Sequence, residues 1–158
     1  MKTIKKITLI ALFICTIFAI SCKKDNNGNT GKTGIYTIDD VTYNGNTSVQ
    51  TFSNGNYSIL CEQKSPYKLL QFVFHSKEEA EAGGEFTVIK NSIATISNVP
   101  SGKVLIGTDY ILLSKPVNSN YKIVVNGNKI LINSNIKLLD LDDDTNDNTT
   151  INSADINF

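Results

Sequence analysis

Apolar and polar side chains alternate along most of the chain after residue 34, and this period of two is typical of β-strands with one buried face. The clearest example is YKIVVNGNKILIN, residues 121–133, where two apolar stretches flank Asn126-Gly127. An Asn-Gly pair suits the two-residue type I′ turn of a β-hairpin, because both central residues need a positive φ. We expect further hairpins at Asn54-Gly55 and at Asp39-Asp40.

One segment departs from this alternation and predicts a short helix. In HSKEEAEAGGEF, Ser76 is followed three residues later by Glu79, which is the capping-box signature, and two glycines end the segment. We therefore expect a helix of about two turns, from Ser76 to Ala82, covering an end or an edge of the sheet.

Short apolar strands bounded by turn residues predict an all-β domain. Further strands are expected in KLLQFVFH, which follows a turn at Pro66, and in EFTVIK, SIATI, KVLIG, YILLS, NIKLLDL and TTINSADINF. About 8 to 10 short antiparallel strands with one short helix fit either a β-sandwich or a closed β-barrel. The β-sandwich is the preferred prediction, and the closed barrel is the alternative.

The N-terminus has the pattern of a secretory signal peptide. Three lysines in MKTIKK precede an uninterrupted apolar stretch from Ile7 to Ile20. As a helix this stretch would span roughly 21 Å, short of the ~30 Å hydrocarbon core of a bilayer. A basic region, a short apolar region and small residues at its end predict cleavage after residue 21, and a permanent transmembrane helix is the alternative.

The cysteine at the expected cleavage site predicts a lipid anchor. Ala19-Ile20-Ser21-Cys22 resembles the lipobox of bacterial lipoproteins, in which the cysteine thiol is diacylglycerylated and the new amino group is acylated. Ala19 stands where the commonest lipobox has leucine, a departure that the looser lipoboxes of the Bacteroidota tolerate. The resemblance implies lipid attachment at Cys22, and several acyl chains would hold the protein stably to a membrane. The alternative is an ordinary signal peptide followed by a chance cysteine.

The residues after Cys22 bear on location and on domain boundaries. By resemblance to the sorting rule of diderm bacteria, Lys23 favours the outer membrane, and Lys23-Lys24-Asp25 partly resembles a surface-export tract. Both the periplasmic and the cell-surface face therefore stay open. Residues 22–33 contain no large apolar side chain, so we expect a flexible tether there and one domain over residues 34–158.

Charge and composition exclude one class of partner. The chain has 15 basic residues, all of them lysine, and 15 acidic residues. Removal of the three signal-peptide lysines leaves a weakly acidic domain without arginine. Nucleic-acid binding needs basic patches that neutralise phosphates, so no nucleic-acid partner is expected.

The residue types that carry catalysis are sparse. His75 is the single histidine, which rules out a zinc site built on a histidine pair, and we expect it to be a partly exposed residue at a strand end. Cys61 lies in the strand NYSILCEQ and is expected to be a small buried hydrophobe, with a reactive thiol or an intermolecular disulfide as the alternative. The remaining candidates are carboxylates in turns or on the short helix: Asp39, Asp40, Asp109, Glu78, Glu79 and Glu81. Nothing in the sequence brings two of these together, so no catalytic residue is assigned.

One acidic run is a candidate metal site. In DLDDDTNDN, Asp140, Asp142, Asp144 and Asn146 alternate like the oxygen ligands of a calcium loop. The glycine and glutamate that an EF-hand needs at its sixth and twelfth positions are missing in both registers. The preferred interpretation is a polar loop between the last two strands. Weak calcium binding is the alternative, and no other cofactor is expected.

As a whole the chain is similar to small uncharacterised lipoproteins of the Bacteroidota, on the lipobox, a tyrosine-bearing first hairpin, the KEEAEAGGEF helix and a β-rich C-terminus. That resemblance implies no known activity. The expected function is a lipid-anchored envelope protein that presents a non-catalytic domain to a protein or glycan partner. Two alternatives stay open: an envelope enzyme or enzyme accessory, and a weak calcium-binding adhesion module.

Overall fold

The computed structural model describes residues 28–91, 98–109, 114–117, 120–140 and 148–158. Its elements in chain order are β1 (Gly28–Ile38), β2 (Val41–Thr51), β3 (Tyr57–Lys64), β4 (Tyr67–Phe74), α2 (Lys77–Ala82), β5 (Gly84–Val88), β6 (Lys103–Gly107), β7 (Ser114–Pro116), β8 (Lys122–Val125), β9 (Lys129–Ile132), β10 (Ile136–Asp140) and β11 (Asn148–Asn157).

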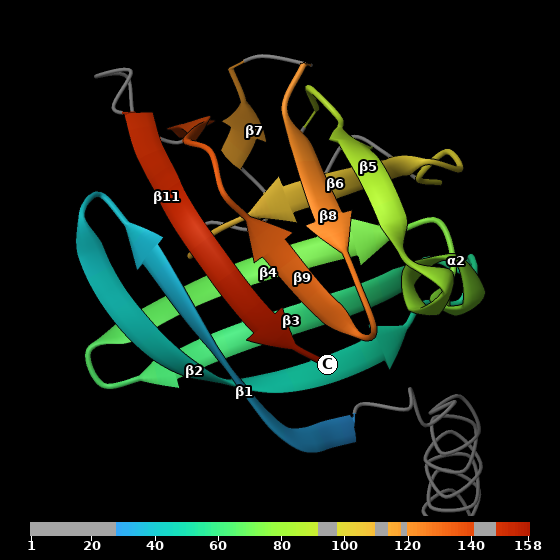
Figure 1. The fold of residues 1–158 in the computed structure, drawn as a ribbon, viewed down its shortest axis with the longest axis horizontal. Helices are drawn as coiled ribbons and strands as arrows, with labels where there is room; N and C mark the ends of the chain where they lie inside the picture. The colour runs from blue at the N-terminus through green and yellow to red at the C-terminus, as the bar shows by residue number, and fades with distance from the viewer. Residues whose placement is uncertain (1–27, 92–97, 110–113, 118–119, 141–147) are drawn as a thin grey trace, which may run out of the picture.

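Nine of the strands close into a barrel (Figure 1). Their order is β1-β2-β3-β4-β6-β5-β8-β9-β11, and β1 pairs with β11 to complete the ring. The all-β prediction is confirmed, but the closed barrel, given as the alternative, is the arrangement found in place of the preferred sandwich. Alternation along a strand requires one buried face, which both architectures supply. The pairing of the first strand with the last one decides between them.

β11 is the longest strand of the C-terminal half and pairs with two strands along one edge. Its C-terminal part pairs with β9, from Ala154 against Ile132, and its N-terminal part pairs with β10, from Ile151 against Ile136. β7 then pairs with the other edge of β10. β10 and β7 therefore extend the wall beyond the closed ring.

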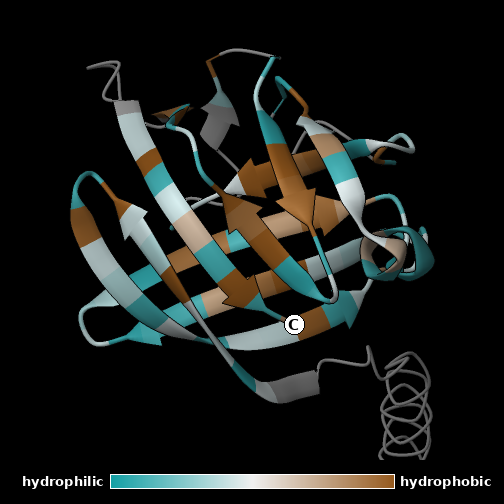
Figure 2. Ribbon diagram, viewed as in Figure 1, coloured by the Kyte–Doolittle hydropathy of each residue, from teal (hydrophilic) through white to brown (hydrophobic). Residues whose placement is uncertain are grey.

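All pairings are antiparallel except the one between β5 and β6. A parallel pair needs a crossover, and here the connection spans residues 89–102. Ile89 and Val99 of this connection pack with Val73 of β4 and Leu105 of β6 in a second apolar cluster on the outside of the wall. The strands beneath it are thus buried on both faces, which explains the continuous apolar run in β6 (Figure 2).

The two ends of the barrel differ, and we name them for what lies there (Figure 1). The helix end carries α2, the β2–β3 connection and the β8–β9 turn. The turn end carries the β1–β2 turn, the β3–β4 turn and residues 108–109 after β6. The C-terminal Phe158 lies at the helix end, where its N–H donates to the carbonyl of Asn128 in the β8–β9 turn.

Side chains fill the interior of the barrel. Aromatic residues pack near the helix end, where the rings of Phe74 and Phe86 meet edge to face at 4.9 Å. The largest fully buried side chains are Tyr36, Phe72, Phe74, Ile38, Ile59, Leu70, Leu105, Ile106, Ile123, Ile130, Ile132 and Ile136. Most of them occupy the inward phase of their strands, as the alternation predicted.

The short helix agrees with the prediction. Ser76 is the N-cap, and its hydroxyl accepts a hydrogen bond from the N–H of Glu79. The helix ends at Gly83, whose φ of 71° is in the left-handed region that favours glycine. Ala80 is fully buried against the barrel core, so α2 closes this end of the barrel.

The three predicted hairpins form, but only the turn at Asp39-Asp40 has the expected pair of residues with positive φ. In the connection between β2 and β3, residues 52–56, Gly55 has a φ of 89° and Asn54 has no positive φ. Asp39 and Asp40 occupy the β1–β2 turn with φ of 50° and 63°. In the β8–β9 hairpin the residues with positive φ are Gly127 and Asn128, one position later than the expected Asn126-Gly127. Asn126 instead pairs with Lys129 by two main-chain hydrogen bonds, because the alternation in β8 and β9 fixes the register of the strands.

The N-terminal boundary also differs from the expectation. β1 begins at Gly28, within the segment 22–33 expected as a tether, and Gly28 and Asn29 pair with Val49 and Ser48 of β2. Main-chain pairing with β2 holds this part of β1 in place. The absence of large apolar side chains therefore did not exclude a strand there. Residues 22–27 lie outside the described residues, as do the predicted strand SIATI and most of YILLS.

A close approach between β1, β2 and β3 depends on two glycines. Gly34 and Gly45 pair across β1 and β2, and both face the thiol of Cys61 on β3. A Cβ at Gly45 would lie 2.7 Å from Cys61 Sγ and 2.8 Å from the main-chain nitrogen of Glu62. The first three strands can therefore pack this tightly only because no side chain occupies either position.

We predict that Gly45→Ala lowers the free energy of unfolding by about 1–3 kcal/mol, because the added methyl overpacks a site bounded by backbone. Asn46→Ala is the matched control, since the exposed side chain of the neighbouring residue points outward and its loss should change stability by less than about 0.5 kcal/mol. Urea denaturation of both variants measures the difference. Equal stability of the two variants would contradict the tight packing described here.

Candidate functional site

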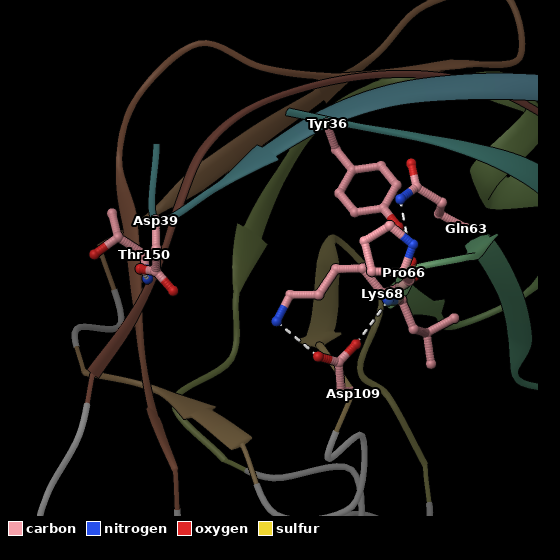
Figure 3. Close-up of polar contacts among 8 residues, drawn as sticks. Tyr36, Asp39, Gln63, Pro66, Lys68, Asp109 and Thr150 are labelled. Carbon is pink, nitrogen blue, oxygen red and sulfur yellow. Dashed lines mark hydrogen bonds and ion pairs between the residues drawn. The ribbon is translucent and has the colours of Figure 1, made fainter. Parts of the chain in front are cut away.

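A polar cluster lies at the turn end of the barrel (Figure 3). Tyr36 points inward from β1, and its hydroxyl donates a hydrogen bond of 2.7 Å to the carbonyl of Lys68 on β4. Two strands separate β1 from β4 in the sheet, so this side chain reaches across the barrel interior. Its ring is fully buried, and it stacks on the ring of Tyr43 at 5.6 Å.

Asp109 completes the cluster from the segment after β6. Its carboxylate accepts hydrogen bonds from Lys68 Nζ at 2.6 Å and from the N–H of Leu69 at 2.7 Å. The β4–β6 ladder ends at Gln71 against Gly107, and the carboxylate satisfies the N–H of Leu69 two residues beyond it. Lys68 is about four-fifths buried, and its ammonium lies 6.0 Å from the centre of the Tyr43 ring.

Gln63 joins the β3–β4 turn to β2. Its side-chain oxygen accepts from the N–H of Asn44 at 2.8 Å, and its side-chain nitrogen donates to the carbonyl of Pro66 at 3.1 Å. The rim beside these contacts carries two exposed apolar side chains, Tyr67 at 54% exposure and Val41 at 52%. The turn end therefore combines internally bonded polar groups with an exposed aromatic and an exposed aliphatic residue.

The two aspartates of the first turn serve closure of the barrel. Asp39 accepts from the N–H of Thr150 at 2.7 Å and donates its own N–H to the carbonyl of Thr150 at 2.9 Å. Asp40 makes two hydrogen bonds with the side chain of Asn152. These contacts lie next to the irregularity between Thr37 and Ile38 in the β1–β11 ladder. Asp39 and Asp40 thus fasten β1 to β11, and Asp39 lies apart from the cluster around Asp109 (Figure 3).

Burial raises the pKa values of the Tyr36 hydroxyl and the Cys61 thiol, so both groups keep their protons at neutral pH. Desolvation raises the pKa of the Tyr36 hydroxyl well above its ordinary value, and the nearby thiol of Cys61 adds to the rise. Desolvation also raises the pKa of the Cys61 thiol to about 11, against hydrogen bonds from Thr47, Gly34 and Gly45 that lower it. Cys61 is fully buried, as predicted. Near pH 7 it is a neutral thiol, and a neutral thiol is a poor nucleophile.

His75 lies at the opposite end of the barrel from Asp109. It is exposed, and its Nδ1 lies 2.7 Å from the carbonyl of Val99. The carboxylate of Glu79 on the nearby helix accepts from the hydroxyl of Ser101 and from the N–H of Gly102. Glu78 and Glu81 are exposed on the same helix. The structure therefore gives these carboxylates structural or solvent-facing positions.

The candidate calcium ligands are not brought together in the described part of the chain. Asp142, Asp144 and Asn146 lie outside the described residues, and Asp140 is the last residue of β10. Among the residues that the structure does describe, no three histidine, cysteine, aspartate or glutamate side chains are grouped so as to hold a metal ion. Cys22, the predicted site of lipid attachment, also lies outside them.

The cluster of Tyr36, Lys68 and Asp109 was not predicted from the sequence. One signal was present, since Lys68 shares the period-two phase of Leu70 and Phe72 and must therefore point toward the interior. A lysine in an inward phase needs a partner of opposite charge, but sequence spacing cannot identify a partner 41 residues away.

The described residues include no helix that is long and apolar enough to cross a membrane.

We predict that Asp109→Ala lowers the free energy of unfolding by about 1–3 kcal/mol, because Lys68 loses its counter-charge and Leu69 loses its acceptor. Asp109→Asn keeps an oxygen for Leu69 and should cost less. The control is Asp155→Ala, which removes an exposed ion pair with Lys129 and should cost less than about 1 kcal/mol. Urea denaturation ranks the three variants, and a loss at Asp155 equal to that at Asp109 would contradict the assignment.

The raised pKa of Cys61 predicts a loss of stability in alkaline solution. The folded state keeps a proton that the unfolded state loses above pH 9, so the free energy of unfolding stays level below pH 9 and falls as pH rises toward about 11. This thiol alone should remove about 1 kcal/mol by pH 10. Cys61→Ala should flatten the slope between pH 8.5 and 10, measured by urea denaturation. Identical slopes in the two proteins would show that Cys61 is not the titrating group.

Comparisons with protein-family models, with curated proteins and with solved structures found no match to this chain. The functional interpretation of the barrel accordingly rests on its own residues and their geometry.

Proposed function

We propose that this chain is a lipid-anchored protein of the bacterial cell envelope, held in the outer membrane through Cys22, whose barrel serves as a non-catalytic binding or structural module. The observation that carries the proposal is that the polar side chains at the turn end make their hydrogen bonds within the fold. The Asp109 carboxylate bonds to the Lys68 ammonium and to a main-chain N–H, the Tyr36 hydroxyl bonds to a main-chain carbonyl, and the interior behind them is filled.

The protonation states support a binding role over a catalytic one. Catalytic groups usually have a pKa moved toward the working pH, whereas burial moves the pKa values of Tyr36 and Cys61 away from neutrality. His75 lies at the helix end and the cluster with Asp109 lies at the turn end, so the two do not form an acid–base pair. The side chains that are left for contact with a partner are exposed ones such as Tyr67 and Val41.

A protein or a glycan is the class of partner that this surface suits. An amphipathic tyrosine ring offers a flat apolar face and a polar tip, which both kinds of interface use. The amide of Gln63 and the carboxylates of Asp39 and Asp40 border the same end of the barrel. The barrel would then present the binding surface, and the lipid on Cys22 would hold that surface at the outer membrane.

We predict that Cys22→Ala abolishes incorporation of a fatty-acid label and moves the protein out of the detergent-rich phase on phase separation. Cys61→Ala is the matched control, because it removes the other cysteine of the predicted mature chain and should leave both properties unchanged. Metabolic labelling of the two variants in cells provides the measurement. Retention of the label by Cys22→Ala would overturn the proposed anchor.

A further inference from the structure

We infer that the barrel stands with its helix end toward the bilayer and its turn end away from it. This inference rests on the proposed lipid attachment at Cys22, and it adds which part of the fold meets the membrane surface. It follows from three features: the point where the chain enters the barrel, the short distance in sequence from Cys22 to that point, and the two lysines that follow Cys22.

The chain enters the barrel at the helix end. Gly28 pairs with Val49, two residues before the end of β2, and β2 ends beside the helix end. Four residues further along β1, the ammonium of Lys32 donates to the main-chain carbonyl of Phe158. Phe158 in turn bonds to Asn128 in the β8–β9 turn, so the start of β1, the C-terminus and this turn lie near one another (Figure 1).

The chain between the anchor and the barrel is short. Gly28 is six residues after Cys22, so the connection reaches about 22 Å at most. β3 and β4 have eight residues each, which gives strands of roughly 26 Å and a barrel of about 20 Å along its axis once the tilt of the strands is included. If the turn end faced the bilayer, the connection would have to run the length of the barrel almost fully extended. That arrangement removes nearly all of its conformational freedom.

The lysines next to the anchor shorten the reach of the connection further. Lys23 and Lys24 follow Cys22 directly, and basic residues next to a lipid anchor are attracted to anionic headgroups. This attraction holds the first part of the connection at the bilayer surface, so less of it is left to extend along the barrel. The charges of the barrel itself do not distinguish its ends, because exposed Glu78 and Glu81 lie at the helix end as Asp39 does at the turn end.

The experiment measures the depth of a fluorophore at each end of the barrel. Asn126→Cys places a thiol on the exposed β8–β9 turn at the helix end, and Lys64→Cys places one on the exposed end of β3 at the turn end. Each full-length lipidated variant is labelled with an environment-sensitive maleimide and reconstituted into vesicles that contain headgroup-spin-labelled lipid. We expect loss of fluorescence by quenching at residue 126 and little loss at residue 64.

The unsubstituted protein is the control that separates this inference from the proposed anchor. Its Cys61 is buried, and a lipidated Cys22 has no free thiol, so the folded protein should take up no label. If it is labelled at Cys22, the proposed anchor fails. If it stays unlabelled and quenching at residues 64 and 126 is equal or reversed, the anchor stands and the proposed orientation is wrong.

Discussion

The pairing of β1 with β11 is the interaction on which the rest of the structure depends. It joins residues 34–38 to residues 151–156, so it closes a loop that contains almost the whole domain. The hydrogen bonds from Asp39 and Asp40 to β11 span 111 and 112 residues. Closing a loop of that length costs about 4 kcal/mol of chain entropy, and the five paired positions together with the two aspartates offset that cost at one place. Without this pairing, β1 and β11 would each be an exposed edge next to an open interior.

Closure also determines what the barrel can do. Strands paired around a closed ring have no free edge, and beyond the ring the sheet ends at β7, a strand of three residues that ends in proline. Nine strands enclose a space that large inward side chains fill, including one tyrosine that reaches across it. The polar groups at the turn end complete this packing: Asp109 extends the hydrogen bonding of β4, and Lys68 lies between the carboxylate and an aromatic ring. These groups serve the fold, and the exposed apolar side chains of this end, Tyr67 and Val41, lie on its rim.

Local features of the fold could be predicted from the sequence, and long-range ones could not. The helix follows from Ser76, Glu79 and Gly83, which lie within eight residues of one another, and each hairpin follows from a turn pair between two alternating runs. The choice between sandwich and barrel depends on β1 meeting β11, and no local pattern encodes that meeting. The same limit applies to the candidate site, since the phase of Lys68 indicates an inward lysine while its partner Asp109 comes from another strand end. The shift of the β8–β9 turn to Gly127-Asn128 has the same kind of cause, because the register of the two strands prevailed over the preferred turn residues.

The strand that closes the barrel is also the strand through which the proposed anchor is attached. β1 begins nearest to Cys22 and bonds to β2 on one edge and to β11 on the other. If a partner at the turn end pulls away from the membrane, the load reaches the anchor along the axis of β1. A load in that direction acts on the hydrogen bonds of both edges together, whereas a load across the strand would break them one after another. A lipid attached at this end of β1 would therefore place the anchor where the barrel resists tension through the β1–β2 hairpin and the long-range β1–β11 pairing together.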